Sequence, residues 1–183
     1  MVPLLPFSDY TPALRENVGK YDAAAAMLFF ALAQMSVLHA QIDPADVYAQ
    51  DGFGLEHNPH CSLLCGIDAA VRPQPVLELI QRYPLPELHL HNVSTFPARP
   101  DSPFQVLKFD IDAPGLHEIN QALAETFAHT SRFAYHPHCT IAYLQKGSAE
   151  QYVRHFSGSE ERVHPSQVVY SKAGDGKTIR VFV

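Results

Sequence analysis

The clearest pattern in the chain lies within residues 104–111, where apolar and polar positions alternate from residue 107 to residue 111. Its apolar positions are Leu107, Phe109 and Ile111, and its polar positions are Lys108 and Asp110. Successive side chains of a β-strand point to opposite faces, so this period of two predicts a strand that is buried on one face. Residues 88–96, 168–171 and 178–182 also read as strands, and Ala173-Gly174-Asp175-Gly176 between the last two is typical of a hairpin turn.

Helical spacing marks three other segments. After Pro114-Gly115, four apolar residues fall on one stripe of a helix. They are Leu116, Ile119, Leu123 and Phe127. Residues 76–80 have the same spacing after two prolines, which a first helical turn tolerates. Ser148 is the predicted N-cap of a helix that ends near His155.

Residues 23–32 fit two patterns, because alanine favours helix while a short apolar run without a polar face also suits a buried strand. We predict a strand at about 25–32, followed by a short helix to about 41. The alternative is a single helix from Asp22 to Gln41. Residues 1–20 contain three prolines and are expected to form an extended lead-in with room for a short edge strand.

One short motif occurs twice in the sequence. His57-Asn58-Pro59-His60-Cys61-Ser62-Leu63-Leu64 and His136-Pro137-His138-Cys139-Thr140-Ile141-Ala142 share Pro-His-Cys, a hydroxyl residue and a branched aliphatic residue. The apolar, β-favouring residues after each histidine predict a strand. Each half of the chain therefore reads strand, helix and His-x-Ser/Thr strand, which indicates an internal repeat.

Alternation along these two strands predicts which side chains share a face. The set His60, Ser62 and Leu64 would lie on one face, as would the set His138, Thr140 and Ala142, while Cys61, Leu63, Cys139 and Ile141 would face the core. Two imidazoles and two hydroxyls could then meet. Phosphodiester cleavage needs a base, an acid and donors to the charged oxygens. Imidazole serves as either acid or base near neutral pH, so the predicted catalytic set requires no metal and no other cofactor.

Several alternatives stay open. The pattern His-x-Ser/Thr also occurs at residues 129–131 and 164–166, although without the shared frame. A metal site could draw on histidine pairs: His57 with His60, His89 with His91, and His136 with His138. Hydrolytic zinc sites usually recruit carboxylates or three converging histidines, whereas here a hydroxyl accompanies each repeated histidine. A third alternative is nucleophilic attack by Ser62 or Cys61. A fourth is that the two strands are buried and their histidines have a purely structural role.

Composition limits the class of protein. A chain of 183 residues with 46% apolar and 17% charged residues suits one domain or two small lobes that share a core. A net charge of −6 lacks the basic excess that long nucleic acids demand, but it allows a small anionic ligand in a local pocket. The three cysteines read as small hydrophobes in a reducing cytosol. We expect a cytoplasmic protein without a membrane segment.

The sequence resembles the 2H phosphoesterase superfamily, whose two His-x-Ser/Thr motifs correspond to His60/Ser62 and His138/Thr140. The resemblance covers roughly residues 24–155. It implies an α+β, bilobal fold in which two pseudo-symmetric lobes of antiparallel sheet, with flanking helices, enclose a central cleft. Lobe one would span about 20–85, lobe two about 86–155, and a C-terminal hairpin about 166–183. It also implies metal-independent phosphodiesterase activity.

Within that superfamily, the flanking residues look most like the phage branch, which includes anti-CBASS nucleases that destroy cyclic oligonucleotide immune signals. The similar segments are Ile42–Tyr48, Gly54–Glu56, Tyr135–Leu144 and Lys146-Gly147. The resemblance implies hydrolysis of 3′-5′ bonds in cyclic di- or oligonucleotides, in a host cytoplasm if the gene is carried by a phage. The alternatives are RNA 2′,3′-cyclic phosphodiesterase or 2′-5′ RNA ligase-like end processing, and a non-catalytic nucleotide-binding sponge.

A cyclic or short nucleotide would need surfaces for its bases and phosphates. Aromatic side chains can stack on bases, and lysines can contact phosphates. The candidates are Phe53, Lys108, Tyr135, Tyr143 and Lys146. Aromatic residues in such positions belong to the core at least as often, so packing is the competing interpretation of the three rings.

Overall fold

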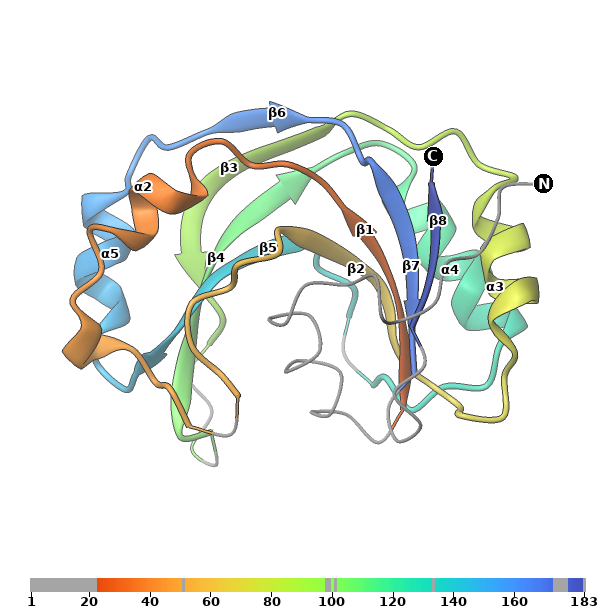
Figure 1. The fold of residues 1–183 in the computed structure, drawn as a ribbon, viewed down its shortest axis with the longest axis horizontal. Helices are drawn as coiled ribbons and strands as arrows, with labels where there is room; N and C mark the ends of the chain where they lie inside the picture. The colour runs from red at the N-terminus through yellow and green to blue at the C-terminus, as the bar shows by residue number, and fades with distance from the viewer. Residues whose placement is uncertain are drawn as a thin grey trace.

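The computed structural model describes residues 23–50, 52–97, 100, 102–132 and 134–172, together with the backbone of residues 178–182. Two four-stranded antiparallel sheets form an arch, and helices cover its outer side at both ends (Figure 1). The predicted α+β fold class is confirmed. The predicted lead-in at residues 1–20 and the turn residues 173–176 lie outside the described part of the chain.

The first two and the last two strands in the sequence form one sheet, and the four strands between them form the other. The first sheet has the order β2-β1-β7-β8, from β1 (Ala24–Phe29), β2 (His60–Ile67), β7 (Gln167–Ser171) and β8 (Thr178–Phe182). The second has the order β5-β4-β3-β6, from β3 (Leu88–Thr95), β4 (Phe104–Asp112), β5 (His138–Gln145) and β6 (Glu161–Val163). The helices are α2 (Met35–His39), the 3₁₀ turn η2 (Pro44–Asp46), α3 (Pro73–Ile80), α4 (Leu116–Thr126) and α5 (Ala149–His155).

The ambiguous segment at residues 23–32 forms strand β1 and is followed by helix α2, as predicted. Burial explains why the strand wins over a helix of alanines. Ala24, Ala26 and Leu28 are fully buried, while the residues between them are partly exposed. The segment thus has a period of two, which the small size of alanine hides in the sequence.

Two details of the predicted elements need correction. Ser148 occupies the N-cap position of α5, but its hydroxyl makes no capping hydrogen bond to that helix. Strand β6 was not predicted, because three residues with a mixed pattern give too weak a signal. The C-terminal hairpin forms as predicted, and its strand β7 lies between β1 and β8, so it belongs to the interior of the first sheet.

The two histidine strands, β2 and β5, are edge strands that meet in the middle of the arch (Figure 1). Two of the helices cross from one sheet to the other. Helix α2 connects β1 to β2 in the first sheet yet packs on β5 of the second, and α4 connects β4 to β5 yet packs on β2. Each histidine strand is thus covered by a helix from the other half of the sequence. The division into two lobes that fold separately remains a prediction.

The far end of β2 holds the loop after α4 by a close backbone approach. Gly66 has a φ of 76°, and its carbonyl accepts a hydrogen bond of 2.9 Å from the Thr130 amide. A Cβ at Gly66 would lie 2.6 Å from Thr130 Oγ1, which is too close. Only a residue without a side chain therefore fits between β2 and this loop.

We predict that Gly66→Ala destabilises the protein more than Gly158→Ala. Both positions have positive φ, which costs an L-residue about 1–2 kcal/mol, but nothing lies within 4 Å of a Cβ at Gly158. The difference between the urea unfolding midpoints of the two variants then measures the cost of the close contact with Thr130. Equal midpoints would show that the loop does not pack closely against β2.

Candidate active site

The same hydrogen bond fixes both histidines at the start of their strands. Nδ1 of His60 donates to the carbonyl of Asn58 at 2.8 Å, and Nδ1 of His138 donates to the carbonyl of His136 at 2.7 Å. A carbonyl can only accept, so Nδ1 carries the hydrogen in each ring. Nε2 is then the nitrogen of each imidazole that is suited to exchange a proton.

Reciprocal contacts across the seam hold the two motifs together. The Cys61 thiol interacts with the backbone of His138, and the Cys139 thiol interacts with the backbone of His60. Both cysteines are fully buried, as predicted. The two histidines lie close enough for His60 to act electrostatically on His138. Packing of the two motifs thus brings both imidazoles to one site.

Each histidine strand carries a bulge at the third residue after its histidine. In β2, Met27 pairs with Ser62 and Ala26 with Leu64, so Leu63 is skipped. In β5, Lys108 pairs with Thr140 and Leu107 with Ala142, so Ile141 is skipped. A bulge re-aims the side chains that follow it.

These bulges correct part of the predicted alternation. Leu64 and Ala142 were expected on the same faces as the histidines. Each now pairs with a fully buried core residue, Ala26 or Leu107, and each is itself buried. Up to the bulge the prediction is confirmed, because Cys61, Leu63, Cys139 and Ile141 are all fully buried.

A side chain from the crossing helix binds the bulged carbonyl in each half. Asn120 of α4 donates through Nδ2 to the carbonyl of Leu63 at 2.7 Å. His39 of α2 donates through Nε2 to the carbonyl of Ile141 at 2.9 Å. Burial is the main reason that the pKa of His39 lies below its ordinary value, and this favours the neutral ring. A helix from the opposite half of the structure therefore helps to fix the shape of each histidine strand.

The surroundings of the second motif are polar. Lys108 lies opposite Thr140, and its ammonium bonds to Ser94 Oγ at 2.8 Å and to the carboxylate of Asp110. Asp110, opposite His138, also accepts hydrogen bonds from Asn92 and Ser94. Burial alone would raise the pKa of Asp110, but the lysine and the two neutral donors outweigh it, so the pKa is lowered.

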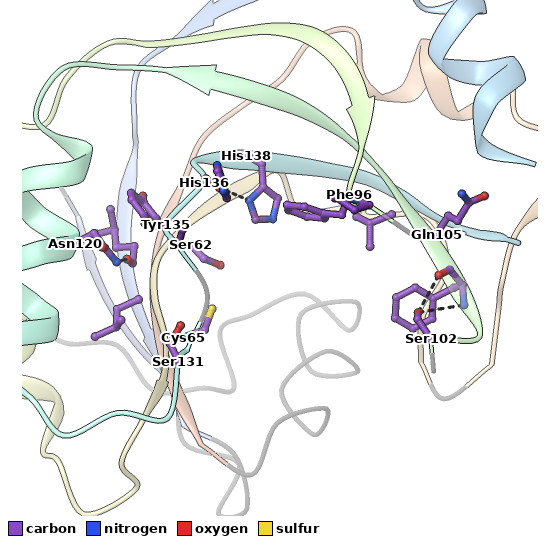
Figure 2. Close-up of a pocket in the computed structure, with 16 residues that line it drawn as sticks. Ser62, Cys65, Phe96, Ser102, Gln105, Asn120, Ser131, Tyr135, His136 and His138 are labelled. Carbon is purple, nitrogen blue, oxygen red and sulfur yellow. Dashed lines mark hydrogen bonds between the residues drawn. The ribbon is translucent and has the colours of Figure 1, made fainter. Parts of the chain in front are cut away.

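A cleft of about 590 Å³ opens beside the two motifs. Figure 2 shows His138 and Phe96 side by side in its wall. Its polar lining comes from Ser62, Cys65, Ser102, Gln105, Asn120, Ser131, Tyr135, His136 and His138. Among the described residues, no lysine, arginine, aspartate or glutamate lines it. The walls can therefore accommodate neutral groups on either side of a single anion at the histidines.

The five candidate substrate-binding residues lie in different places. Tyr135 lines the cleft, where its hydroxyl is 3.9 Å from Cys61 Sγ. Burial raises its pKa. Lys108 lies beneath Phe96, with its ammonium 4.8 Å from the ring centre. Lys146 is exposed and donates to the carbonyl of Pro100 at 3.0 Å.

Phe53 and Tyr143 do not reach the histidines. Their ring centres are 4.7 Å apart, and both pack on Phe104 in an aromatic cluster near the far end of β5. Tyr143 is five residues from His138, about 17 Å along a strand. Of these rings, Phe104 lines the far end of the cleft.

Sequence reasoning missed the two phenylalanines that contact the rings of His60 and His138. Phe29 stacks on His60 with ring centres 5.1 Å apart, and Phe96 meets His138 edge to face at 4.8 Å. Phe29 was readable as the end of a strand, but its position opposite His60 depends on the register between β1 and β2. Phe96 follows β3, and nothing in the sequence indicates its contact with β5.

The rival chemistries find little support in this geometry. Burial raises the pKa of Cys61 to about 11 and also raises that of Cys139, which opposes a thiolate nucleophile. Of the other two His-x-Ser/Thr patterns, His129 bridges to Ile67 beyond the site, and His164 lies near Glu87. Within the described residues, no group of three or more metal-binding side chains is arranged to hold an ion.

Comparisons with known proteins agree with this arrangement. The model of the 2′-5′ RNA ligase superfamily matches residues 36–164. The structure of Kluyveromyces marxianus Usb1 has a similar fold, with a TM-score of 0.52 and 11% sequence identity over 91% of this chain and 100% of that chain. No curated protein sequence matches the chain. No helix among the described residues is long and apolar enough to cross a membrane.

We predict that His60→Ala and His138→Ala each lower kcat by about 10²- to 10⁴-fold, because each removes a proton-transfer group. Ser62→Ala and Thr140→Val should cost less, since each removes a hydrogen-bond donor and keeps both imidazoles. His164→Ala, in an exposed His-x-Ser pattern, is the matched control and should retain activity. A loss in that control as large as in the other two would contradict the assignment. Circular dichroism would verify the fold of every variant.

Proposed function

The chain belongs to the 2′-5′ RNA ligase superfamily of two-histidine phosphoesterases and is a phosphodiesterase, and we propose that it cleaves a 3′-5′ bond in a small cyclic nucleotide without a metal ion. The observation that carries this proposal is the matched pair of Nδ1–carbonyl bonds, which gives two neighbouring imidazoles the same tautomer. His138 and Ser62 line the cleft, and His60 lies beside them. One ring can then accept a proton while the other donates one.

The reaction follows from the groups at the seam. One histidine takes the proton from the adjacent ribose 2′-hydroxyl, or from water, as that oxygen attacks phosphorus. The other histidine protonates the departing 5′-oxygen. Ser62 and Thr140 donate to the non-bridging oxygens, where negative charge concentrates in the transition state. Attack by the ribose leaves a 2′,3′-cyclic phosphate, which water then opens in a second step.

The size and charge of the cleft favour a compact substrate. A volume of about 590 Å³ lies in the range of small-molecule sites. A polymer would need a row of cations along its backbone, and the described lining has none. One scissile phosphate with a nucleoside on each side suits these walls. The motifs similar to the phage branch support a cyclic di- or oligonucleotide immune signal, and hence immune evasion, as the biological setting.

A second candidate function is RNA end processing, by hydrolysis of a terminal 2′,3′-cyclic phosphate or by 2′-5′ ligase-like chemistry. The family description favours it, since it names RNA. The same two histidines would act, and a single-stranded RNA end would replace the ring. A third outcome, a nucleotide-binding sponge, would keep the cleft and lack turnover.

We predict that activity persists in excess EDTA, because the two imidazoles and two hydroxyls already supply acid, base and charge stabilisation. The measurement compares turnover with and without chelator, with a metal-dependent nuclease as the control. Loss of turnover in EDTA, with recovery on adding zinc or manganese, would refute the two-histidine mechanism.

We predict that a panel of cyclic di- and trinucleotides contains a cleaved member, and that mass analysis finds a 2′,3′-cyclic phosphate intermediate. The matched ring with 2′-deoxyribose should be inert if the ribose attacks, and its cleavage would assign the attack to water. Failure on every ring together with cleavage of a terminal 2′,3′-cyclic phosphate would establish the RNA-end function. Tight binding of a ring without turnover would indicate a sponge.

A further inference from the structure

The two halves of the site match in nearly every respect. Both histidines have the same Nδ1–carbonyl bond, and both strands have a bulge at the same position. Even the neighbouring backbone repeats: the Phe30 amide donates to the Pro59 carbonyl at 3.2 Å, and the Ile111 amide donates to the Pro137 carbonyl at 3.0 Å. Any difference between the halves therefore stands out against a common frame.

The halves differ in the residues opposite the catalytic pairs. In the first sheet, Met27 lies opposite Ser62 and Phe29 lies opposite His60. In the second sheet, the same two positions carry Lys108, opposite Thr140, and Asp110, opposite His138. An apolar pair in one half is thus replaced by an ion pair in the other.

This ion pair is held in place from several directions. The residue Lys108 is only 5% exposed, and a buried ion pair is costly unless further hydrogen bonds satisfy it. Ser94 bonds to both members of the pair. Asn92 donates to the far carboxylate oxygen of Asp110 from a register shift in β3, with a φ of 48°. A residue with a strained backbone conformation thus helps to fix the carboxylate.

The Phe96 ring contacts both the ion pair and His138. The ammonium of Lys108 lies over one face of the Phe96 ring, 4.8 Å from its centre, and the same ring contacts His138 at 4.8 Å. The charged or titratable side chains that act on His138 are Lys108 and Asp110 from β4 and His60 from β2. Burial, assisted by Lys108, holds the pKa of His138 below its ordinary value.

We propose that Lys108 and Asp110 are a positioning pair that makes the two catalytic histidines unequal, so that His138 is the neutral ring that accepts the attacking proton and His60 delivers the proton to the leaving oxygen. The lysine disfavours a second positive charge on the His138 side, and the carboxylate limits that effect. This assignment rests on the two-histidine mechanism proposed above.

The first test needs no substrate. NMR titration follows the ring proton of His138, assigned by its absence in His138→Ala, in the wild type and in two variants. Lys108→Met places the residue found at Met27 in the equivalent position and leaves the Asp110 charge unopposed, so the midpoint should rise. Asp110→Asn leaves the lysine unopposed, so the midpoint should fall. Each shift should be on the order of one pH unit. Lys108→Met/Asp110→Asn should titrate above the wild type, because the lysine acts on His138 more strongly than the carboxylate does.

Matched controls remove a charge elsewhere. Arg154→Met takes a cation from the exposed face of α5, and Asp112→Asn takes a carboxylate from an exposed position of β4. Neither should move the His138 midpoint. Shifts of opposite sign in the two test variants cannot come from a general loosening of the fold. Shifts of the same sign, or none, would overturn the role of the pair even if the enzyme cleaves its substrate.

The second test assigns the base. In the pH profile of kcat/KM for a cyclic diadenylate, or for adenosine 2′,3′-cyclic phosphate if the ring is inert, the acidic limb reports protonation of the base. That limb should move to higher pH in Lys108→Met and to lower pH in Asp110→Asn. Movement of the basic limb instead would make His138 the acid and overturn the assignment. Failure of both substrates would refute the proposed function and leave the NMR result standing.

Discussion

The candidate active site depends on one seam, where two edge strands from different sheets meet and bring their histidines within electrostatic reach of each other. Edge strands have unpaired backbone groups, and a protein must cover or pair them. Here the Tyr48 and Glu56 amides donate to carbonyls along the edge of β5, and the Thr130 amide donates to the far end of β2. Between the two strands, the buried thiols of Cys61 and Cys139 contact the backbone of the opposite histidine. Cysteine is small and apolar enough for this close approach. Any change that separated the sheets would also separate the two imidazoles.

Local patterns predicted the elements well, because the information lies within a few residues of each strand or helix. The alternation at residues 107–111 predicted β4, and the stripe from Leu116 predicted α4. The repeated motif predicted the two histidine strands and their buried cysteines. What failed was the face of Leu64 and Ala142, because a bulge depends on the register with a partner strand and leaves no mark in a single sequence.

Residues around the site were harder to predict for the same reason. Phe29 and Phe96 contact the histidines through pairing and chain turns that join distant segments. Asn120 reaches Leu63 only because its helix crosses to the other sheet. Conversely, Phe53 and Tyr143 have the chemistry of base-stacking residues, but they pack on Phe104 instead. Residue type indicates what a side chain can do, and long-range topology decides whether it lies where the chemistry occurs.

The asymmetry of the site follows from the demands of the reaction. Two identical imidazoles in identical surroundings would have equal claims on a single proton, whereas in-line displacement needs a neutral ring on one side of phosphorus and a protonated ring on the other. A duplicated motif supplies the pair of rings. Only a difference outside the motif can make one imidazole hold a proton more readily than the other. The ion pair opposite Thr140 and His138 is such a difference, and the apolar residues opposite Ser62 and His60 are its counterpart. Because Phe96 forms part of the cleft wall and covers Lys108, the charge acts on the His138 ring while the wall itself stays neutral.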